Sequence, residues 1–231
     1  MNQNAAYIIP RYPILNPQKA KIFENLNLQD SVLLRSTLYL NLIENFINKE
    51  SKIDFYFFLD IVDRNFLTAE FNIEKISLSF VDLSNKQVLV ENLANKEFSK
   101  HKKNIFISPD IMGLNLKEVE RLLNLLNIED DSLLIGKSKE GELGFLGFNS
   151  YSDEIAQGLI KSDFNYDNFL SKIKSSSHFI NTVNDILVVR NLNNFKQLYT
   201  DLSQKKSIDY CSQEIHERFT HLFIEHKDLL K

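Results

Sequence analysis

The sequence predicts an α/β fold, a three-layer α/β/α sandwich with a mainly parallel central sheet, and the stretch Asn104–Ser150 indicates it most clearly. Asn104–Ser108 and Asp131–Ser138 are apolar enough for buried strands, and apolar residues at helical spacing separate them. A strand, a helix and a second strand in this order are typical of a parallel unit whose helix covers the sheet. Ile53–Ile61 is almost continuously apolar and aromatic, as expected of a central strand covered on both faces.

The other expected elements follow the same alternation. The first strand is expected at Ala5–Pro10, and Asp30 or Ser31 can cap a helix that reaches about Lys49. The remaining elements expected from apolar patterning are a short helix at Phe66–Phe71, a strand at Lys75–Val81, a short helix within Ser84–Ser99, a strand at Leu143–Phe148, helices at Ser152–Ile160 and Tyr166–Lys174, a strand at Ile186–Arg190, a helix after Asn191–Asn194, and an amphipathic helix over Ser207–Lys231. No repeat or linker marks a boundary, so residues 1–231 are expected to form a single domain.

The composition limits the classes of partner. Of the 231 residues, 43% are hydrophobic and 25% are charged, and the net charge is -4, so neither nucleic acid nor an anionic membrane is expected as a partner. No apolar run approaches the roughly 20 residues of a membrane span, and the N-terminus lacks the pattern of a signal peptide. The single cysteine, Cys211, excludes an internal disulfide and suits a reducing compartment. A cytoplasmic location is therefore expected.

The histidines and the cysteine do not indicate a zinc site or a nucleophile. His216, His221 and His226 are spaced five residues apart on the expected C-terminal helix, which turns successive side chains about 140° apart. They are therefore expected to be surface or packing residues. Cys211 lies on the apolar stripe of the same segment and is expected to be a core thiol. An exposed apolar face on this helix would indicate a protein partner.

Acidic residues at strand ends are better candidates for chemistry. Asp110 follows one predicted strand, and Glu140 and Glu142 lie in the turn after another, so the three could meet at one edge of the sheet. There two or three of these carboxylates could hold Mg²⁺ or Mn²⁺ against a diphosphate. The alternative is that Asp110 caps a turn and the glutamates are solvated.

The long loop after the first strand is the usual place for phosphate contacts in an open α/β fold. It contains no glycine, so main-chain amides cannot approach a phosphate as they do in a glycine-rich loop. Arg11, Lys19 and Lys21 could supply side-chain contacts instead; the alternative is that all three are ordinary solvated charges. Asp60 and Asp63, at the end of a central strand, are expected to be surface-loop residues.

Two segments, ISPDIMGLNLKEVERLLNLL and LLIGKSKEGELGFLGFN, resemble the core of the GT-A-type nucleotide-diphospho-sugar and nucleotidyl transferases. The nearest resemblance is to the small bacterial glycosyltransferase-like family that includes arsenosugar biosynthesis enzymes and is similar to the molybdenum cofactor guanylyltransferases. That family has a first motif, Gly-x-Asp-x-Pro-x-Leu, of which Asp110 keeps the aspartate. In its second motif, Gly-Pro-x-x-Asp-Gly-Gly-Tyr, Glu140-Gly141 stands in place of Asp-Gly, and Glu142 replaces the second glycine. The acidic pair of a later motif falls on Val188 and Arg190, and the phosphate loop of the family is not recognisable.

The resemblance implies a glycosyltransferase or nucleotidyltransferase that uses a nucleotide-activated donor and a divalent cation. Asp110 would ligate the cation with Glu140 or Glu142 assisting, Gly141 and Glu142 would border the donor, and Arg11, Lys19 or Lys21 would contact its phosphates. The alternative is a non-catalytic relative of this fold that acts as a binding or assembly protein, as a homo-oligomer or with another protein. The lost acidic pair and phosphate loop favour this second interpretation.

Overall fold

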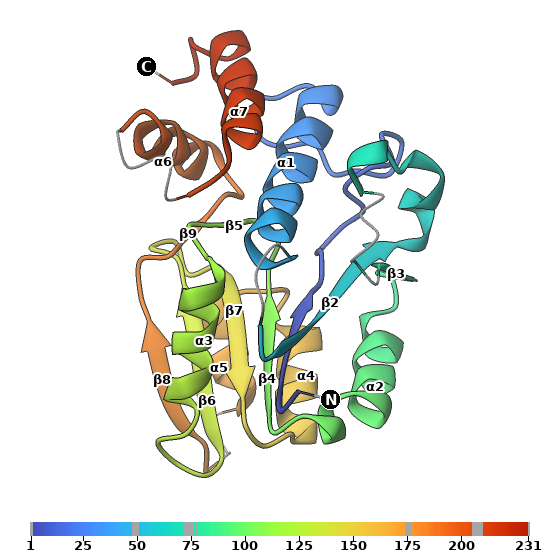
Figure 1. Cartoon of the computed structure of the whole chain (residues 1–231), viewed down its shortest axis with the longest axis vertical. Coiled ribbons are helices and arrows are strands. Elements are labelled where there is room, and N and C mark those ends of the chain that lie inside the picture. Colours follow the sequence, from blue (N-terminus) through green and yellow to red (C-terminus); the bar gives the residue numbers. More distant parts are fainter. Residues whose placement is uncertain are drawn as a thin grey trace.

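The computed structural model describes residues 2–47, 51–71, 76, 78–173, 177–204 and 210–230. Within these residues, one sheet of seven strands has the order β3-β2-β1-β4-β7-β6-β8 (Figure 1). Every neighbouring pair is parallel except the two that involve β7, which is antiparallel to β4 and to β6. The strands are β1 (Asn4–Ile8), β2 (Ile53–Asp60), β3 (Leu78–Val81), β4 (Lys103–Ile107), β6 (Ser132–Lys137), β7 (Leu143–Phe148) and β8 (Phe179–Val183). The predicted α/β sandwich with a mainly parallel sheet is confirmed.

Helices cover both faces of this sheet. The described helices are α1 (Leu28–Ile47), α2 (Lys86–Lys96), α3 (Leu116–Leu125), α4 (Asp153–Lys161), α5 (Tyr166–Ile173), α6 (Leu192–Leu202) and α7 (Gln213–Glu225), with short 3₁₀ helices at Ile61–Phe66, Ala69–Phe71 and Phe98–Lys100. The alternation of β1 shows the two layers: Ala6 and Ile8 pack with α1, α3, α6 and α7, whereas Ala5 and Tyr7 pack with α2, α4 and α5. Both faces of β1 are therefore buried.

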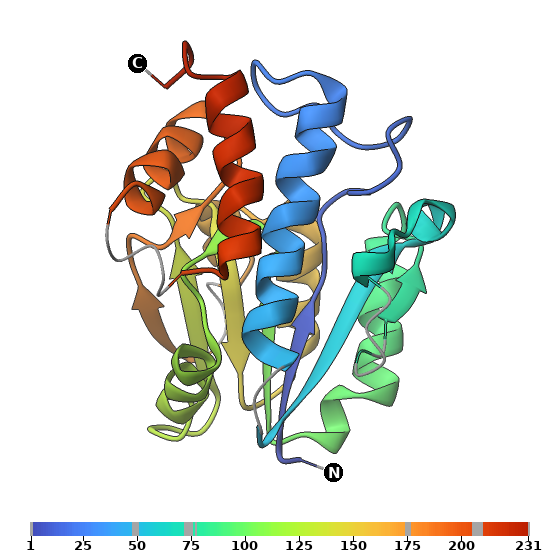
Figure 2. The ribbon, with the colours of Figure 1, turned by 45° about the horizontal axis from the view of Figure 1, so that its top comes forward.

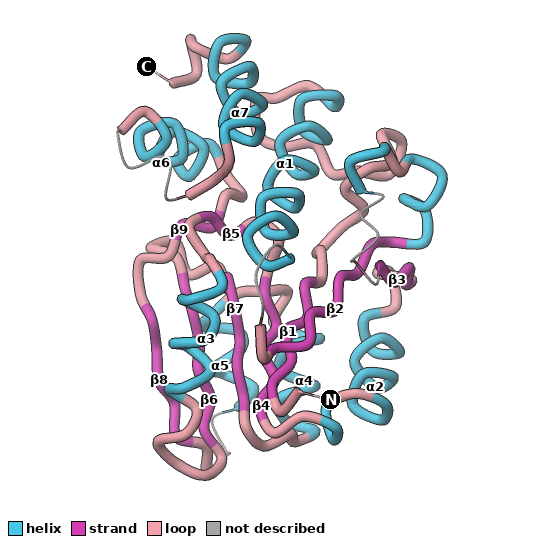
Figure 3. The backbone as a smooth tube through the Cα atoms, in the orientation of Figure 1, coloured by secondary structure: helices cyan, strands magenta, loops and turns pink. Residues whose placement is uncertain are grey.

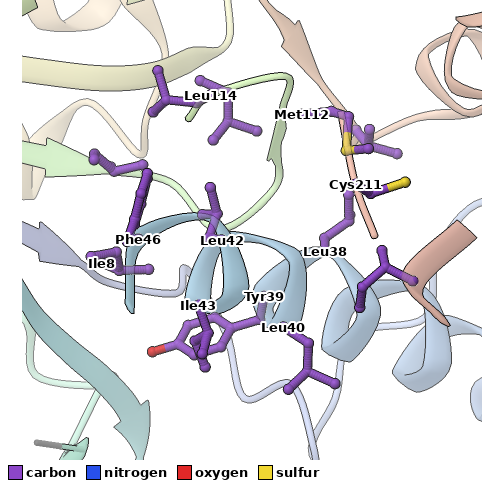
Figure 4. Packing of buried hydrophobic residues seen from close by; sticks show 14 of the residues in the cluster. Ile8, Leu38, Tyr39, Leu40, Leu42, Ile43, Phe46, Met112, Leu114 and Cys211 are labelled. Atoms are coloured by element: carbon purple, nitrogen blue, oxygen red, sulfur yellow. The ribbon is translucent and has the colours of Figure 1, made fainter. Parts of the chain in front are cut away.

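Helix α1 lies between the sheet and α7, and every residue from Ser36 to Ile43 is buried. Leu38, Leu42 and Phe46 pack in one cluster with Met112 and Leu114, which follow β4 (Figure 4). On the outside α7 runs beside α1 (Figure 2). A helix covered on two sides needs little polar surface, which explains the leucine-rich sequence.

The expected cap of α1 was wrong. The helix begins at Leu28, and Asn27 Oδ1 accepts a hydrogen bond from Asp30 N at 2.8 Å. The Asp30 carboxylate instead lies 2.7 Å from Nε2 of His226, which joins the start of α1 to the end of α7. Ser31 Oγ accepts a hydrogen bond from Phe23 N at 2.8 Å, so it fixes the preceding loop.

The segment Asn104–Ser150 has the predicted strand, helix and strand, but the two parallel strands are not neighbours in the sheet. β4, α3 and β6 follow one another, and β4 and β6 point the same way, but β7 lies between them in the sheet. The hairpin turn from Ser138 to Glu142 returns the chain into this gap. As a result, the turn that carries Glu140 and Glu142 lies at the same edge of the sheet as the carboxyl end of β4.

Two expectations about the late strands were wrong. Edge strand β8 was not expected, because its sequence FINTV has no buried apolar run and Phe179 and Ile180 are exposed. The strand expected at Ile186–Arg190 does not enter the main sheet. Its core, β9 (Leu187–Val188), pairs with β5 (Ile111–Met112) in a separate two-stranded ribbon (Figure 3).

The surface-loop interpretation of Asp60 and Asp63 was also wrong, since both side chains are buried. Asp60 accepts hydrogen bonds from Val62 N and Leu83 N at 3.0 and 3.1 Å. Asp63 is fully buried and accepts three, from the main-chain N–H groups of residues 14, 15 and 16, at 2.8 to 3.0 Å. Asp63 therefore anchors the long loop between β1 and α1, whose main-chain donors have no strand or helix to pair with.

The apolar stripe of the C-terminal helix is covered within the chain. Ile215, Phe219, Leu222 and Phe223 of α7 are buried against the core that α1 and α6 share, and Ile224 is exposed. Cys211 is buried, and burial raises the pKa of its thiol to about 11, which confirms a core thiol. Residues 207–209, where the helix was expected to start, lie outside the described residues.

Among the described residues, no helix combines the length and the apolar character that a bilayer crossing requires.

Replacement of Asp63 is expected to destabilise the protein strongly. Asp63→Ala leaves three buried N–H groups without acceptors, so the free energy of unfolding should fall by about 3 kcal/mol. The measurement is urea denaturation, with Asp130→Ala as the control, because Asp130 is exposed. A similar small loss in both variants would contradict the anchoring role of Asp63.

Candidate functional site

The candidate site is a cleft of about 290 Å³ at the carboxyl ends of β1 and β4. β1 and β4 are neighbours in the sheet. After β1 the chain continues to β2, toward one edge of the sheet, and after β4 it continues to β6, toward the opposite edge. Open α/β sheets bind ligands at such a switch point, beyond the carboxyl ends of the strands. The lining residues are Pro10, Arg11, Tyr12, Ile14, Lys21, Ile22, Glu24, Arg35, Asp110, Val189 and Arg190.

Arg190 is at the centre of the polar contacts at this edge. Only 9% of its side chain is exposed, and its five guanidinium N–H groups are matched by five hydrogen bonds to oxygen. The acceptors come from three separate segments. Asp110 Oδ2 (2.9 Å) and Ser108 Oγ (2.9 Å) follow β4, Glu142 Oε2 and the carbonyl oxygen of Leu143 (3.2 Å) lie at the start of β7, and the carbonyl oxygen of Phe164 (3.5 Å) follows α4.

The ribbon of β5 and β9 brings Arg190 to this position. Val189 N donates to the carbonyl oxygen of Asp110 at 2.8 Å, which continues the pairing of the ribbon up to Arg190. The ribbon also packs tightly on β7. A Cβ on Gly144 would lie 2.3 Å from Ile186 Cδ1, 3.1 Å from Val188 Cγ2 and 3.2 Å from Ile111 Cδ1, so a larger residue would force these side chains to shift.

A second ion-pair group borders the first. Arg11 Nε donates to Asp163 Oδ1 at 3.0 Å, Lys86 Nζ lies 3.1 Å from the same oxygen, and Arg11 NH1 lies 3.9 Å from Glu142 Oε2. Partial burial alone would raise the pKa of Asp163, but the hydrogen bonds from Arg11 and Lys86 outweigh it and lower that pKa. Asp163 and Phe164 have φ of 49° and 60°, a left-handed conformation that is unusual for a bulky residue such as phenylalanine. This strained turn presents the Phe164 carbonyl to Arg190.

Arg35 is a cation of the cleft that, like Lys21, forms no ion pair with a carboxylate among the described residues. It lies on α1, and its guanidinium donates to the carbonyl oxygen of Lys21. Burial lowers its pKa, although the charge of Asp110 acts in the opposite direction. Lys21 Nζ lies 4.9 Å from the centre of the Tyr12 ring on the same wall. A half-buried cation of this kind is suited to a ligand that brings negative charge.

Solved structures with known folds match this chain over its whole length. A protein from Desulfovibrio desulfuricans assigned as a nucleotide-diphospho-sugar transferase matches with a TM-score of 0.66 at 14% identity, covering 100% of this chain and 97% of the other. A cytidylyltransferase from Leptospira borgpetersenii matches with a TM-score of 0.54 at 10% identity, covering 100% and 97%. A 4-diphosphocytidyl-2C-methyl-D-erythritol synthase from Anaerococcus prevotii matches with a TM-score of 0.50 at 10% identity, covering 95% and 96%. No family model and no curated protein matches the sequence.

The chain has the fold of the nucleotide-diphospho-sugar transferases. The fold that the resemblance implies is confirmed, and the narrower bacterial family remains a prediction.

Within this transferase fold, the structure brings some of the predicted site residues together. Asp110 and Glu142 share the guanidinium of Arg190, and Arg11 and Lys21 line the cleft. Lys19 is exposed and is not among the lining residues. The predicted catalytic and donor-binding roles of these residues remain predictions.

Glu140 and Gly141 lie at the tip of the turn after β6. Glu140 is exposed and accepts a hydrogen bond from Asn194 Nδ2 at 3.1 Å. Partial burial would raise the pKa of Glu140, but this contact and the hydrogen bonds of the turn outweigh it and lower that pKa. Gly141 has φ of +78°, which explains a glycine at this position, and its carbonyl oxygen accepts a hydrogen bond from Tyr166 N at 2.8 Å.

The carboxylates of this site do not fit a divalent cation as they are arranged. Asp110 and Glu142 both face Arg190, and among the described residues no three His, Cys, Asp or Glu side chains are grouped so that they could hold a metal. Hard cations such as Mg²⁺ require carboxylate oxygens that are free to bind them. The metal-ligand role of Asp110 therefore remains a prediction, and its partner in the structure is a guanidinium.

Arg35 and Arg190 were not recognised as site residues from the sequence. Arg190 did carry a signal, because it stands where the resembling family has an acidic residue. Arg35 carried a weaker one, as a charge among the buried leucines of α1. Neither signal indicates which distant segments these side chains contact.

Removal of Arg190 is expected to destabilise the fold far more than removal of an exposed arginine. Arg190→Met leaves the carboxylates of Asp110 and Glu142 without their partner, so the free energy of unfolding should fall by about 3–5 kcal/mol. In the control, Arg121→Met, the lost ion pair with Glu118 is 55% exposed on the arginine side, and the change should stay within about 0.5 kcal/mol. Urea denaturation measures both. Equal effects would show that the Arg190 contacts add no stability.

Proposed function

We propose that this protein is a glycosyltransferase or nucleotidyltransferase that uses a nucleotide-activated donor, and that the phosphates of the donor lie in the cleft at the ends of β1 and β4. The observation that carries this proposal is the lining of the cleft: Arg11, Lys21 and Arg35 face the same space as Asp110. A diphosphate carries negative charge that increases as it leaves the donor, and fixed cations stabilise that charge. The position at the switch point of the sheet supports the same site.

The residues have separate roles in this proposal. Arg35 contacts the phosphates through the donors that its single bond to the Lys21 carbonyl leaves available, and Lys21 and Arg11 add charge at the entrance. Asp110, which borders the cleft, is the carboxylate placed to orient the sugar or the acceptor. Glu140, which Asn194 holds in place, is the second candidate catalytic carboxylate, and Gly141 and Glu142 form the adjoining wall.

Mg²⁺ and Mn²⁺ have no role in the proposed reaction. Of the two carboxylates that line the cleft, Asp110 is ion-paired with Arg190, as is the neighbouring Glu142, and Glu24 accepts a hydrogen bond from Leu192 N at 2.9 Å. The neutralisation of the phosphates is therefore assigned to side-chain cations. Arg35 and Lys21 are the principal ones, because neither forms an ion pair with a carboxylate among the described residues. The guanidinium of Arg35 also has further donors beside the one bonded to the Lys21 carbonyl oxygen.

A non-catalytic role as a binding or assembly protein is the second candidate. The ion pairing of Asp110 favours it, since a carboxylate held by a guanidinium is less available for chemistry. The state of α7 does not favour it, because the apolar stripe expected to seek a partner is covered by α1 and α6. The two candidates differ in whether the cleft binds a nucleotide.

A thermal-shift screen against nucleoside triphosphates and nucleotide sugars tests the proposal. A ligand at about 100 times its dissociation constant adds about 2.7 kcal/mol, which for this size raises the melting temperature by several degrees. Arg35→Met should weaken the binding of any ligand found by about tenfold to a hundredfold, matching about 1.5–3 kcal/mol for a hydrogen bond to a charged group. Arg121→Met is the matched control, because Arg121 is exposed on α3, outside the cleft.

If no nucleotide shifts the melting temperature, the non-catalytic role is favoured. A shift that Arg35→Met leaves unchanged would place the binding site elsewhere on the protein.

A further inference from the structure

The oxygen atoms around Arg190 form a set that resembles the ligand shell of a hard cation. Two carboxylates, a hydroxyl group and two main-chain carbonyl groups converge on one side chain. These oxygen types are the ones that Mg²⁺ and similar ions bind. Here the positive charge at their centre is a guanidinium that belongs to the chain.

The formal charges at this edge already cancel. The carboxylates are Asp110, Glu142 and Asp163, and the cations paired with them are Arg190, Arg11 and Lys86. A divalent cation would therefore meet no excess negative charge, and it would have to displace the guanidinium to reach Asp110 and Glu142. Displacement is costly because the Arg190 side chain is almost fully buried and all of its donors are used.

We propose that Arg190 takes the place of a divalent cation at this edge of the sheet, so that the cleft binds phosphate groups without a metal ion. Arg190 is a positioning residue in this arrangement: it holds Asp110 and Glu142 at the border of the cleft and has no donor left for a ligand. The phosphates meet Arg35 and Lys21 instead, which line the cleft. Only the phosphate-binding part of this inference rests on the proposed function.

A titration of the protein with Mn²⁺ alone, followed by electron paramagnetic resonance, tests whether the charge of residue 190 controls metal binding. The wild type should show no tight binding of Mn²⁺. Arg190→Asp exchanges the cation for a third carboxylate beside Asp110 and Glu142, so the affinity for Mn²⁺ should rise by at least about a hundredfold. Arg64→Asp, an equal charge change at an exposed position away from the cleft, should leave the affinity unchanged.

Two outcomes would contradict the inference that Arg190 takes the place of a divalent cation. One is tight binding of Mn²⁺ by the wild type that Asp110→Asn abolishes. The other is a folded Arg190→Asp protein that binds Mn²⁺ no better than Arg64→Asp. If Arg190→Asp does not fold, the titration of the wild type with its Asp110→Asn control decides the question, because it needs no change at Arg190.

The second measurement is isothermal titration calorimetry with inorganic pyrophosphate, in EDTA and in Mn²⁺. We expect the protein to bind pyrophosphate with equal affinity in the two buffers, and Arg35→Met to lower that affinity by about tenfold or more. Binding that requires Mn²⁺ would overturn the inference. No binding in either buffer would count against the proposed donor site, while the Mn²⁺ titration would still decide the role of Arg190.

Discussion

The arrangement of the candidate site depends on the buried ion pairs of Arg190. One guanidinium joins the end of β4, the turn before β7, the loop after α4 and its own segment after β9. These segments are distant in the sequence, and Arg190 is 80 residues from Asp110. Burying charged groups costs solvation free energy, and good geometry with full hydrogen bonding offsets that cost. Such a centre tolerates little movement, so the segments that border the cleft are fixed relative to one another.

The fold delivers these groups because the parallel strands end at the same edge. Arg11 follows β1, Asp110 follows β4, Glu142 follows β6, and Arg190 follows β8 and the short ribbon. Antiparallel β7 places the turn of Glu142 next to the end of β4. The strained turn at Asp163 and Phe164, in the layer of α4 and α5, supplies the last acceptor of Arg190, the Phe164 carbonyl oxygen. The ion pairs of Asp163 with Arg11 and Lys86 hold this turn in place. Local strain of this kind persists where surrounding contacts determine the conformation.

The sequence predicts the parts of this structure that depend on local patterns. Strands β2, β4 and β7 are continuous apolar runs, and the acidic residues that follow β4 and β6 could be assigned to one edge of the sheet from strand order alone. Strand β8 could not be predicted, since an exposed edge strand has no apolar pattern. The burial of Asp63 depends on main-chain groups about 50 residues away, and the contacts of Arg190 and Arg35 depend on which distant segments the folded chain brings together. Pairings of this kind leave no periodicity in the sequence.

An arginine and a divalent cation have different consequences for a cleft of this type. A bound metal ion can hold carboxylates and still offer open coordination positions to a phosphate, whereas the donors of Arg190 are all directed at the protein. The carboxylates are then in place before any ligand binds, but the positive charge for the ligand must come from another residue. Arg35 meets this requirement. Burial disfavours its charged form and lowers its pKa, and Asp110, which is ion-paired with Arg190, offsets this only in part. A phosphate that enters the cleft would supply the direct ion pair that Arg35 lacks.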